Sequence, residues 1–549
     1  MKTSLSTALR YWETVRWLKP EQLYGRVLFR LARPKVDASP APPRRSLTAS
    51  WATPALRQPS LIGPKRFRFL NLEGAISEIG WDGAEREKLW RYNQHYFEDL
   101  VSSGAADRHD WHEALLGDWL SHNPPAIGTG WEPYPLSLRV VNWIKWALAG
   151  GRLSESLTES LAIQARFLTQ RLERHLLGNH LFVNAKALIF AGLYFDGPEA
   201  RAWRRIGFGI LEREFREQIL ADGGQFERSP MYHALALEDV LDLINVARTF
   251  EGALDTVERA AVVRWEAAVP AMRRWLAALS HPDGDISLFN DAAFGIAPHR
   301  DELEAYANRL GFERGETGAP LTWLAESGYV RLEQTDAVLL CDLAPIGPDY
   351  LPGHAHADTL SFELSLFGAR AIVNSGTSVY GLSEERLRQR GTPAHNTVTV
   401  AGRNSSDVWS GFRVGARARP RGVKVYQDGA HLIAEGSHDG YRSLPGRPIH
   451  SRRWQLGPGS LRIEDRVSPG DHPAEARFHL HPDVTADQAS ASEGAILMAG
   501  GKRVHWRAEG GPIRIEDSTW HPEFGKGVPC RCVVLPLCNG AASLALSWT

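Results

Sequence analysis

Cysteine is scarce in this sequence, and neither sign of charge is in excess. Four cysteines among 549 residues are too few and too clustered for a disulfide framework, and they suggest a reducing compartment. Cys530, Cys532 and Cys538 lie in an apolar, strand-like run, which favours small buried side chains over a site for a soft metal. A formal net charge of -1 excludes a global basic field for nucleic acid, so an anionic ligand would have to meet a local cluster of Arg and His.

Long apolar runs are also lacking. No stretch of about 18 apolar residues occurs, so no transmembrane helix is expected. Among the first twenty residues, Arg10, Glu13, Arg16 and Lys19 interrupt the apolar side chains, which is not the pattern of a signal peptide. We therefore expect a cytoplasmic protein, with a periplasmic or secreted location by another route as the alternative.

The sequence is long and rich in tryptophan. A chain of 549 residues exceeds what one hydrophobic core normally supports, so at least two large domains are expected. Its 19 tryptophans offer flat aromatic surfaces on which sugar rings can stack, although most of these side chains are expected in the core.

Hydrophobic periodicity divides the first 315 residues into two segments. Residues 1–80 combine an amphipathic helix, expected at about residues 9–31, with a Pro-rich connector. Residues 81–315 carry long segments with helical periodicity, which predicts consecutive antiparallel helices in a bundle or toroid. One segment, residues 181–195, is apolar on nearly all sides and is expected to pack among the other helices.

At about residue 321 the period changes from helical to alternating. About a dozen short segments rich in Val, Leu and aromatic residues follow, separated by Gly, Pro, Asp and Ser. In one of them, Phe362 and Leu364 point one way and Glu363 and Ser365 the other. Residues 320–549 are therefore predicted to form an all-β antiparallel sandwich packed on the all-α domain.

Two polar clusters lie in the helical region, and each has an ordinary structural explanation when it is taken alone. In Gly178-Asn179-His180, Asn179 could cap a helix and His180 could be a buried core histidine, or both could donate hydrogen bonds to an anion. In the polar loop of residues 222–233, Tyr232 is either a buried phenol or a functional one.

Two further clusters lie in the strand region. Residues 353–358 place His354 and His356 on the same side of an incoming strand, so both rings can serve one site. His395 precedes another alternating strand and offers a third imidazole for a metal. A cationic run with interleaved aromatics, residues 386–419, is either a solvated basic face or a clamp for carboxylate or sulfate groups.

In their order, these clusters resemble the heparinase II/III family of polysaccharide lyases. The similar stretches are residues 178–195, 222–233, 353–381 and 394–406. By motif the resemblance covers about Trp131 to Arg419. It implies a helical (α/α) toroid joined to an antiparallel β-sandwich, in agreement with the change of period, and β-elimination on polysaccharides that contain uronic acid.

The resemblance also implies roles for single residues. Asn179 and His180 match residues that neutralise the uronate carboxylate and hold the developing enolate-like anion. Tyr232 matches the catalytic tyrosine, proposed as the acid and, for one C5 epimer, also as the base. His354 matches the histidine that acts as base from the opposite face, so a cleft between the two domains is the expected site.

His356 and His395 match family metal ligands, typically for zinc, whose third ligand is a carboxylate. This chain has Asn374 at the corresponding turn, and an amide carbonyl is a poorer ligand that does not neutralise the cation. We expect a divalent metal, zinc or else manganese or calcium, that orders the His354 loop and is bound more weakly than in relatives.

Arg139, Glu227, Trp409 and Arg413 complete the candidate site as substrate-binding residues. The expected substrate is an acidic polysaccharide such as a glycosaminoglycan, alginate or a bacterial exopolysaccharide. Two alternatives remain. A glycoside hydrolase needs two carboxylates that flank the bond, for which Glu227 and Asp222 are the obvious pair. A non-catalytic glycan-binding or polysaccharide-assembly protein could keep the same fold.

Overall fold

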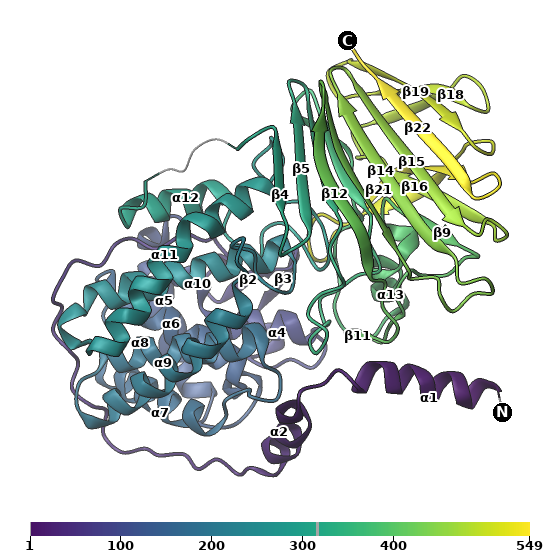
Figure 1. The fold of residues 1–549 in the computed structure, drawn as a ribbon. Helices are drawn as coiled ribbons and strands as arrows, with labels where there is room; N and C mark the ends of the chain where they lie inside the picture. The colour runs from purple at the N-terminus through teal and green to yellow at the C-terminus, as the bar shows by residue number, and fades with distance from the viewer. Residues whose placement is uncertain (1, 314–317) are drawn as a thin grey trace.

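The computed structural model describes residues 2–313 and 318–549 and divides them into a helical body and a body of antiparallel strands (Figure 1). The helical body comes first in the chain, and the strands of the second body follow from Leu321 onward. The fold class predicted from the change of hydrophobic period is therefore confirmed. Among the described helices, none is long and apolar enough to cross a membrane.

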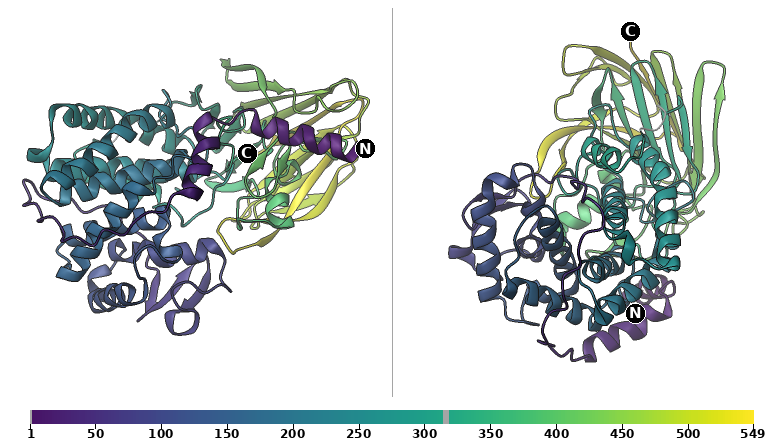
Figure 2. Two further views of the ribbon diagram at one scale, coloured as in Figure 1. Left: turned by 90° about the horizontal axis from the view of Figure 1, so that it is seen from below. Right: turned by 90° about the vertical axis from the view of Figure 1, so that its left-hand side faces the viewer.

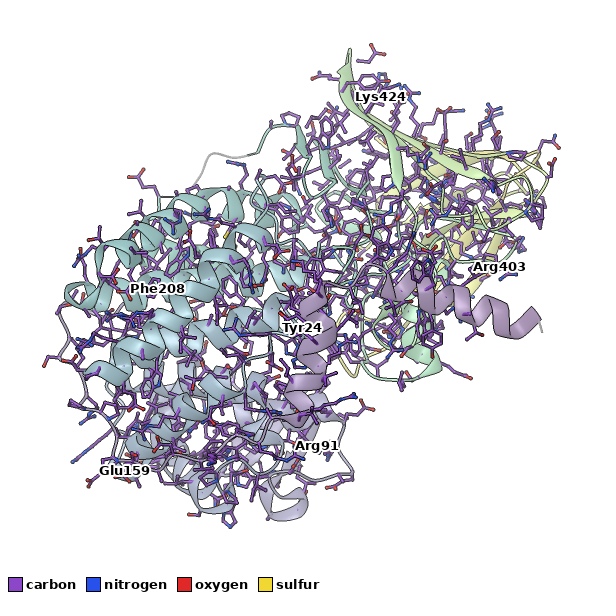
Figure 3. The ribbon with its side chains drawn as sticks, turned by 60° about the horizontal axis from the view of Figure 1, so that its bottom comes forward. Tyr24, Arg91, Glu159, Phe208, Arg403 and Lys424 are labelled. Carbon is purple, nitrogen blue, oxygen red and sulfur yellow. The ribbon has the colours of Figure 1, made fainter. Side chains whose placement is uncertain are left out.

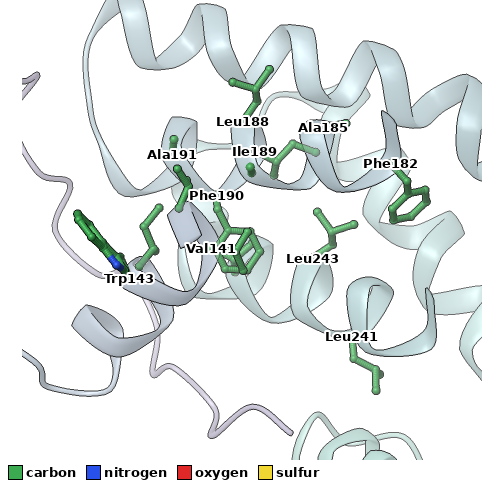
Figure 4. Packing of buried hydrophobic residues seen from close by; sticks show 14 of the residues in the cluster. Val141, Trp143, Phe182, Ala185, Leu188, Ile189, Phe190, Ala191, Leu241 and Leu243 are labelled. Carbon is green, nitrogen blue, oxygen red and sulfur yellow. The ribbon is translucent and has the colours of Figure 1, made fainter. Parts of the chain in front are cut away.

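Long helices form most of the first domain and are arranged as a ring, seen in the right-hand view of Figure 2. They are α4 (Lys88–Tyr96), α5 (His109–His122), α6 (Pro133–Leu148), α7 (Glu155–Gln170), α8 (Gly178–Tyr194), α9 (Pro198–Gln218), α10 (Pro230–Thr249), α11 (Thr256–Ala278) and α12 (Arg300–Arg309). Helix α8 packs against α6, α9 and α10. Figure 4 shows its side chains, among them Phe182 and Ile189, beside Val141 of α6 and Leu243 of α10. A helix that is apolar on all sides was expected to lie among other helices, and this is confirmed.

Two helices occupy the N-terminal segment, α1 (Lys2–Val15) and α2 (Pro20–Leu31), where the sequence predicted one helix at about residues 9–31. The prediction of a single helix is wrong because Pro20 begins α2. A proline disfavours helical backbone in the preceding residue, and Lys19 is extended accordingly.

Helix α1 lies along the strand domain (left view of Figure 2), where Arg10 pairs with Asp407 at 2.8 Å. Tyr24, labelled in Figure 3, is exposed on α2. A small sheet follows the connector and was not predicted from the sequence. Its strands are β1 (Leu61–Gly63), β2 (Arg66–Phe69) and β3 (Leu72–Ala75).

Three antiparallel sheets build most of the second domain. The first runs in chain order through β4 (Leu321–Leu324), β5 (Tyr329–Gln334), β6 (Ala337–Asp342), β7 (Phe362–Leu366) and β8 (Ala369–Ile372). The second has the order β12 (Pro420–Asp428), β13 (His431–His438), β14 (Ile449–Gly457), β15 (Ser460–Ser468), β22 (Ala541–Ser547), β19 (Arg503–Glu509), β18 (Glu493–Leu497), β17 (Thr485–Gln488). The third has the order β20 (Arg514–Trp520), β21 (Val528–Pro536), β16 (Ala474–His479), β9 (Val398–Val400). Their apolar faces share one hydrophobic core.

Strand β7 shows how the two domains are joined. Phe362 and Leu364 enter the core of the sandwich, as the alternation predicted. Glu363 and Ser365 turn the other way, but they are buried and meet the toroid instead of solvent. The two ring nitrogens of His281, just after α11, lie 2.7 Å from the Glu363 carboxylate and 2.7 Å from the Ser365 hydroxyl. The polar face of the strand is therefore part of the interface between the domains.

Candidate active site

A cavity of about 610 Å³ lies between the toroid and the sandwich. Four of the predicted site residues reach it from the toroid, namely Asn179, His180, Glu227 and Tyr232. His354 reaches it from a loop of the sandwich, between β6 and β7. The structure thus brings together five residues from three segments that are far apart in the sequence, in the cleft between domains where the site was expected.

The start of α8 positions Asn179. The residue before the helix, Leu177, has a positive φ of 63°, and it occupies the cap position, so Asn179 is not the helix cap. The Asn179 side chain is free to face the cavity instead. Gly178 has a φ of 56°, and a Cβ at this position would collide with the side chain of Leu351. Only glycine therefore allows the cavity wall to close against the first turn of α8.

His180 is held by a carboxylate that the sequence did not single out. Its Nδ1 lies 3.1 Å from Oε1 of Glu173. The Asn184 amide, one turn further along α8, donates to Oε2 of Glu173 at 3.1 Å and fixes that carboxylate. Burial opposes a charge on the imidazole, but Glu173 and Glu227 outweigh it and raise the pKa of His180. His180 is thereby suited to meet an anion as a cationic hydrogen-bond donor.

Tyr232 lies in the first turn of α10, whose cap is the Ser229 hydroxyl that accepts from the Tyr232 amide at 3.2 Å. Its hydroxyl is 3.1 Å from the hydroxyl of Tyr380, and its ring centroid is 4.0 Å from that of His354. Burial and the neighbouring Tyr380 raise the pKa of the Tyr232 hydroxyl well above its usual value. Tyr232 therefore keeps its proton and is suited to act as a proton donor.

Asp291 is the hub of the site. One carboxylate oxygen lies 3.1 Å from Nδ1 of His354, and the other lies 2.8 Å from Nε2 of His356. The Arg386 guanidinium binds both oxygens, with Nη2 at 2.7 Å from Oδ2. Burial alone would raise the pKa of Asp291, but Arg386 and the two imidazoles hold it well below its usual range. Asp291 is therefore an anion at neutral pH.

This anion fixes the orientation of His354. When Nδ1–H donates to Asp291, Nε2 is left as the nitrogen that can accept a proton. His354 Nε2 lies 3.6 Å from the Glu227 carboxylate, and the ring is 15% exposed. Burial raises the pKa of Glu227. An oriented imidazole beside a tyrosine hydroxyl is an acid–base pair that opens onto the cavity.

Sequence reasoning missed Asp291, although one local signal pointed to it. The residue lies in a loop rich in Gly and Asp between α11 and α12, similar in composition to the loop before Tyr232. Its neighbour Asn290 has a positive φ of 57°, and its amide oxygen accepts from the main-chain N–H of His356 at 3.0 Å. The loop and the His354 segment are thus fixed to each other.

The predicted metal ligands do lie near one another. The rings of His356 and His395 are 5.2 Å apart, and Asn374 accepts from the Asn396 amide at 3.4 Å. Nδ1 of His356, both ring nitrogens of His395 and the Asn374 side-chain nitrogen are buried and have no partner. Burial lowers the pKa of His356 to about 4, so its ring is neutral, as a metal ligand must be.

This donor set fits a divalent cation poorly. Within residues 2–313 and 318–549, no group of three or more His, Cys, Asp or Glu side chains could hold a metal ion. Asp291, the carboxylate next to His356, is already neutralised by Arg386. A cation bound by His356, Asn374 and His395 would therefore lack a negative ligand.

Three of the predicted substrate-binding residues do not line the cavity. Arg139 is fully buried, donates to Gln164 at 2.9 Å and lies 4.0 Å from the Trp119 ring, so its assignment to substrate binding is wrong. Arg413 lies over Trp409 at 4.9 Å, and Trp409 donates to Thr14 of α1 at 3.1 Å. These two residues hold α1 against the sandwich rather than a ligand in the cavity.

None of the arginines in the cationic run, residues 386–419, is among the residues that line the cavity, so the run is not a clamp for a ligand there. Arg386 is bound to Asp291, and Arg390 donates to the main-chain carbonyl of Ala355 at 2.9 Å. Both side chains are buried. Their charges are used to hold the His354 loop in place.

The carboxylate pair expected for a glycoside hydrolase does not form. Asp222 accepts from the amide and hydroxyl of Ser327 at 2.7 and 2.8 Å and is not among the residues that line the cavity. Glu227 lines the cavity without Asp222, and hydrolysis by two carboxylates that flank the bond requires both.

The fold and the site together define a class: a helical toroid joined to an antiparallel sandwich, with an acid–base site in the cleft between them. The model of the heparinase II/III N-terminus matches residues 118–308, and that of the heparinase II/III-like C-terminal domain matches residues 316–548. The chain belongs to the heparinase II/III family.

Relatives of known name differ in how much of the chain they match. A heparin-sulfate lyase of Bacteroides stercoris is 30% identical over 257 residues, which are 41% of this chain and 36% of the relative. The match thus spans about a third of the lyase. FtsZ-localized protein C of Caulobacter vibrioides is 26% identical over 483 residues, 81% of this chain and 80% of the relative. The crystal structure of a heparinase III superposes with a TM-score of 0.66 at 17% identity, covering 84% of this chain and 76% of that one, and so shares the fold.

Proposed function

We propose that this protein is a lyase that cleaves a polysaccharide or oligosaccharide containing uronic acid by β-elimination. The observation that carries the proposal is the contact between Tyr232 and His354, whose rings lie 4.0 Å apart on the cavity wall with Asp291 behind the imidazole. An acid and a base from different domains can act on neighbouring atoms of one sugar ring in such a cleft.

The first step is the removal of the C5 proton. The proton next to a carboxylate is hardly acidic until donors neutralise that carboxylate and hold the enolate-like anion that develops. Asn179 and the protonated His180 supply these donors from the start of α8. Nε2 of His354 accepts the C5 proton, and Asp291 stabilises the imidazolium that forms.

The second step breaks the glycosidic bond. The electron pair left at C5 forms the C4=C5 double bond as the bond from C4 to its oxygen breaks. The Tyr232 hydroxyl gives its proton to the departing oxygen, which its raised pKa allows because the phenol is protonated at neutral pH. Transfer of the proton from His354 to the Tyr232 phenolate through solvent restores both groups, so no water is added to the product.

The names of the relatives support the choice of substrate. Two heparin-sulfate lyases match the chain at 30% and 25% identity, which favours a glycosaminoglycan-like substrate. Alginate and bacterial exopolysaccharides share the reacting uronate and belong to the same proposal.

An absorbance assay tests the reaction directly. Incubation with acidic polysaccharides should produce an ultraviolet-absorbing unsaturated uronate without added cofactor. Tyr232→Phe should lose at least a hundredfold in turnover and still bind, since only the hydroxyl is removed. Tyr426→Phe, an exposed tyrosine of β12, is the matched control and should have wild-type turnover. New reducing ends without a double bond would contradict the proposal.

A second candidate is a non-catalytic role in glycan binding or polysaccharide assembly. FtsZ-localized protein C aligns along 81% of this chain, twice the share covered by the lyases, and its name records a location and no reaction. Under this candidate no uronate-containing polymer is cleaved, and Tyr232→Phe has no turnover to lose.

For the cofactor, we propose at most a weakly held divalent cation at His356, Asn374 and His395, with a structural effect on the His354 loop. Metal analysis after purification without chelator, together with melting curves before and after EDTA, tests this. Full occupancy that survives dialysis would contradict weak binding. A cytoplasmic location stays a prediction that cell fractionation tests.

A further inference from the structure

The cavity has no free cluster of cationic side chains. Among the described residues, four Lys and Arg side chains line it, and each already pairs with a carboxylate. The pairs are Arg57 with Glu238 at 2.6 Å, Lys88 with Glu132 at 2.8 Å, Lys186 with Asp239 at 2.7 Å, and Lys145 with Asp242. The lining also carries five carboxylates, which are Glu87, Glu98, Glu227, Glu238 and Asp239. Counting Lys and Arg against Asp and Glu, the lining has a formal charge of -1.

A ligand could bind the most deeply buried lysines of this set only if their ion pairs with carboxylates were broken, which is unfavourable. Lys145 and Lys186 both bind Asp242, and all three side chains are at most 4% exposed. Burial alone would lower the pKa of Lys186, but Asp239 and Asp242 raise it, so the ammonium stays charged and neutralised in place. Taking away one partner of a buried pair leaves the other charge buried and uncompensated, which is strongly destabilising. A sulfate group entering this part of the cavity would meet no available counter-charge.

The remaining wall is largely apolar. Half-buried aliphatic side chains line much of the cavity, among them Leu89, Leu138, Leu176, Leu235, Ile296 and Leu351. The ring of Phe412, 42% exposed, also faces this space. Leu235 follows Tyr232 on α10 by three residues, so the apolar wall begins next to the proposed acid. Such a surface gains free energy when it covers methyl groups and loses it when it covers desolvated charges.

We propose that the ligand of this cavity is an unsulfated glycan whose sugars carry acyl groups such as N-acetyl, with one carboxylate at the reacting uronate. This inference rests on the proposed function. The single carboxylate meets His180, which lines the cavity and whose Nδ1 is held by Glu173 at 3.1 Å, so that its Nε2 is the nitrogen that can donate to the ligand. The acyl methyl groups cover the leucines of the wall, and the amide dipoles replace the charges that a sulfated chain would bring.

A matched set of ligands tests the inference. Three oligosaccharides share one uronate–hexosamine backbone and are N-acetylated, N-deacetylated or N- and O-sulfated. Binding is measured by calorimetry with the Tyr232→Phe variant, and turnover by absorbance with the wild type. We expect the N-acetylated ligand to bind at least tenfold more tightly than the sulfated one, with the deacetylated ligand between them. Equal or tighter binding of the sulfated ligand, or no binding of any of the three, would overturn the inference.

The two readouts separate this inference from the proposed function. The expected order of binding without turnover of any ligand would leave the inference standing and remove the lyase. Turnover with a preference for the sulfated ligand would do the reverse.

A variant of the wall sharpens the test. Leu235→Gln should weaken binding of the N-acetylated ligand about tenfold and leave binding of the deacetylated ligand within about twofold. A merely structural role of Leu235 would change both affinities by the same factor. Leu387→Gln, on the exposed face of α13 (Glu384–Arg390) and outside the cavity lining, is the matched control and should change neither.

Discussion

Two clusters of Asp, His and Arg, centred on Asp291 and Asp465, are built alike, and of these two only the first opens onto the cavity. Asp291 binds His354, His356 and Arg386 at the seam between the domains. Asp465 binds His450 at 2.7 Å and the Arg452 guanidinium at 2.7 and 2.8 Å inside the sandwich. The residue types and distances are nearly the same in both.

Access and the use of the histidines make the difference. His450 also contacts His438 at 3.2 Å, and Arg452 donates to the main-chain carbonyls of Leu360 and Asn396. The hydrogen-bond donors of this cluster therefore bind other groups of the protein. His354 instead keeps Nε2 on the cavity side and shares its ring face with Tyr232. An Asp–His pair is therefore a candidate base only where the second ring nitrogen of the histidine faces a cavity that a ligand can enter.

The largest effect expected is on turnover at the open cluster. His354→Ala removes the proposed base and should lower kcat/KM by about 10²–10⁴-fold. The melting temperature should change less than turnover does, because Arg386 still pairs both oxygens of Asp291 in the variant. Absorbance kinetics and a thermal melt check both. Retention of more than a tenth of the wild-type kcat/KM would remove His354 from the mechanism.

His450→Ala is the matching variant of the closed cluster. It should destabilise the protein by about 1–3 kcal/mol, since it removes the partner of the buried His438 Nε2 and one of the two donors to Oδ1 of Asp465. The kcat/KM of the folded fraction should stay within about twofold of the wild type, as measured by kinetics below the onset of melting. A large loss of turnover with unchanged stability would contradict the purely structural role of the closed cluster.

Asp291→Asn should act through His354 and therefore more mildly than removal of the base. A loss of about 10–100-fold in kcat is expected, because the imidazole loses its orienting partner. The dependence of kcat on pH should change too. A smaller fraction of the variant should hold the His354 imidazole with an unprotonated Nε2 directed at the cavity. An unchanged profile with a lower melting temperature would mean that Asp291 is only structural.

The pH dependence of turnover should report His180. The pKa of His180 is raised, so its proton is present below that value and is lost as the pH rises through it. The neutralisation of the uronate carboxylate is lost with it, and kcat/KM should fall on the alkaline side. His180→Gln should lower kcat/KM and abolish this alkaline limb. A limb that persists in the variant would belong to another group.

The smallest effect concerns the closed cluster at low pH. Burial would raise the pKa of Asp465, but Arg452 and His450 lower it to about 2. A depressed carboxyl pKa contributes stability that is present above the unfolded value of about 3.9 and is lost as the pH falls towards 2. The difference in unfolding free energy between the wild type and Asp465→Asn should therefore shrink by about 2 kcal/mol from pH 5 to pH 2. A constant difference would contradict this origin of the stability.

How much the sequence could predict depended on the distance between partners along the chain. The change of period, the buried helix α8 and the residues Asn179, Tyr232 and His354 were all visible in local patterns. The role of Asp291 could not be predicted from its loop alone, because its partners His354 and Arg386 are 63 and 95 residues away and only the fold brings them together.

The errors have a similar physical cause. Arg139 was expected in contact with a ligand, but it is buried against Trp119. The basic run was interpreted as either a solvated face or a clamp, but its Arg386 and Arg390 are buried and bind Asp291 and a main-chain carbonyl. Charge along a sequence shows where cations are, and only the packing shows which remain free.

The most direct test of the central claim is the nature of the product formed from an unsulfated, N-acetylated uronate oligosaccharide. We expect an unsaturated uronate, seen as a rise in ultraviolet absorbance and as a cleavage product that has gained no water by mass. Tyr232→Phe should abolish this product, and Tyr426→Phe should not. Binding of this oligosaccharide to the cavity without any such product, or a product that has gained one water, would contradict the central claim.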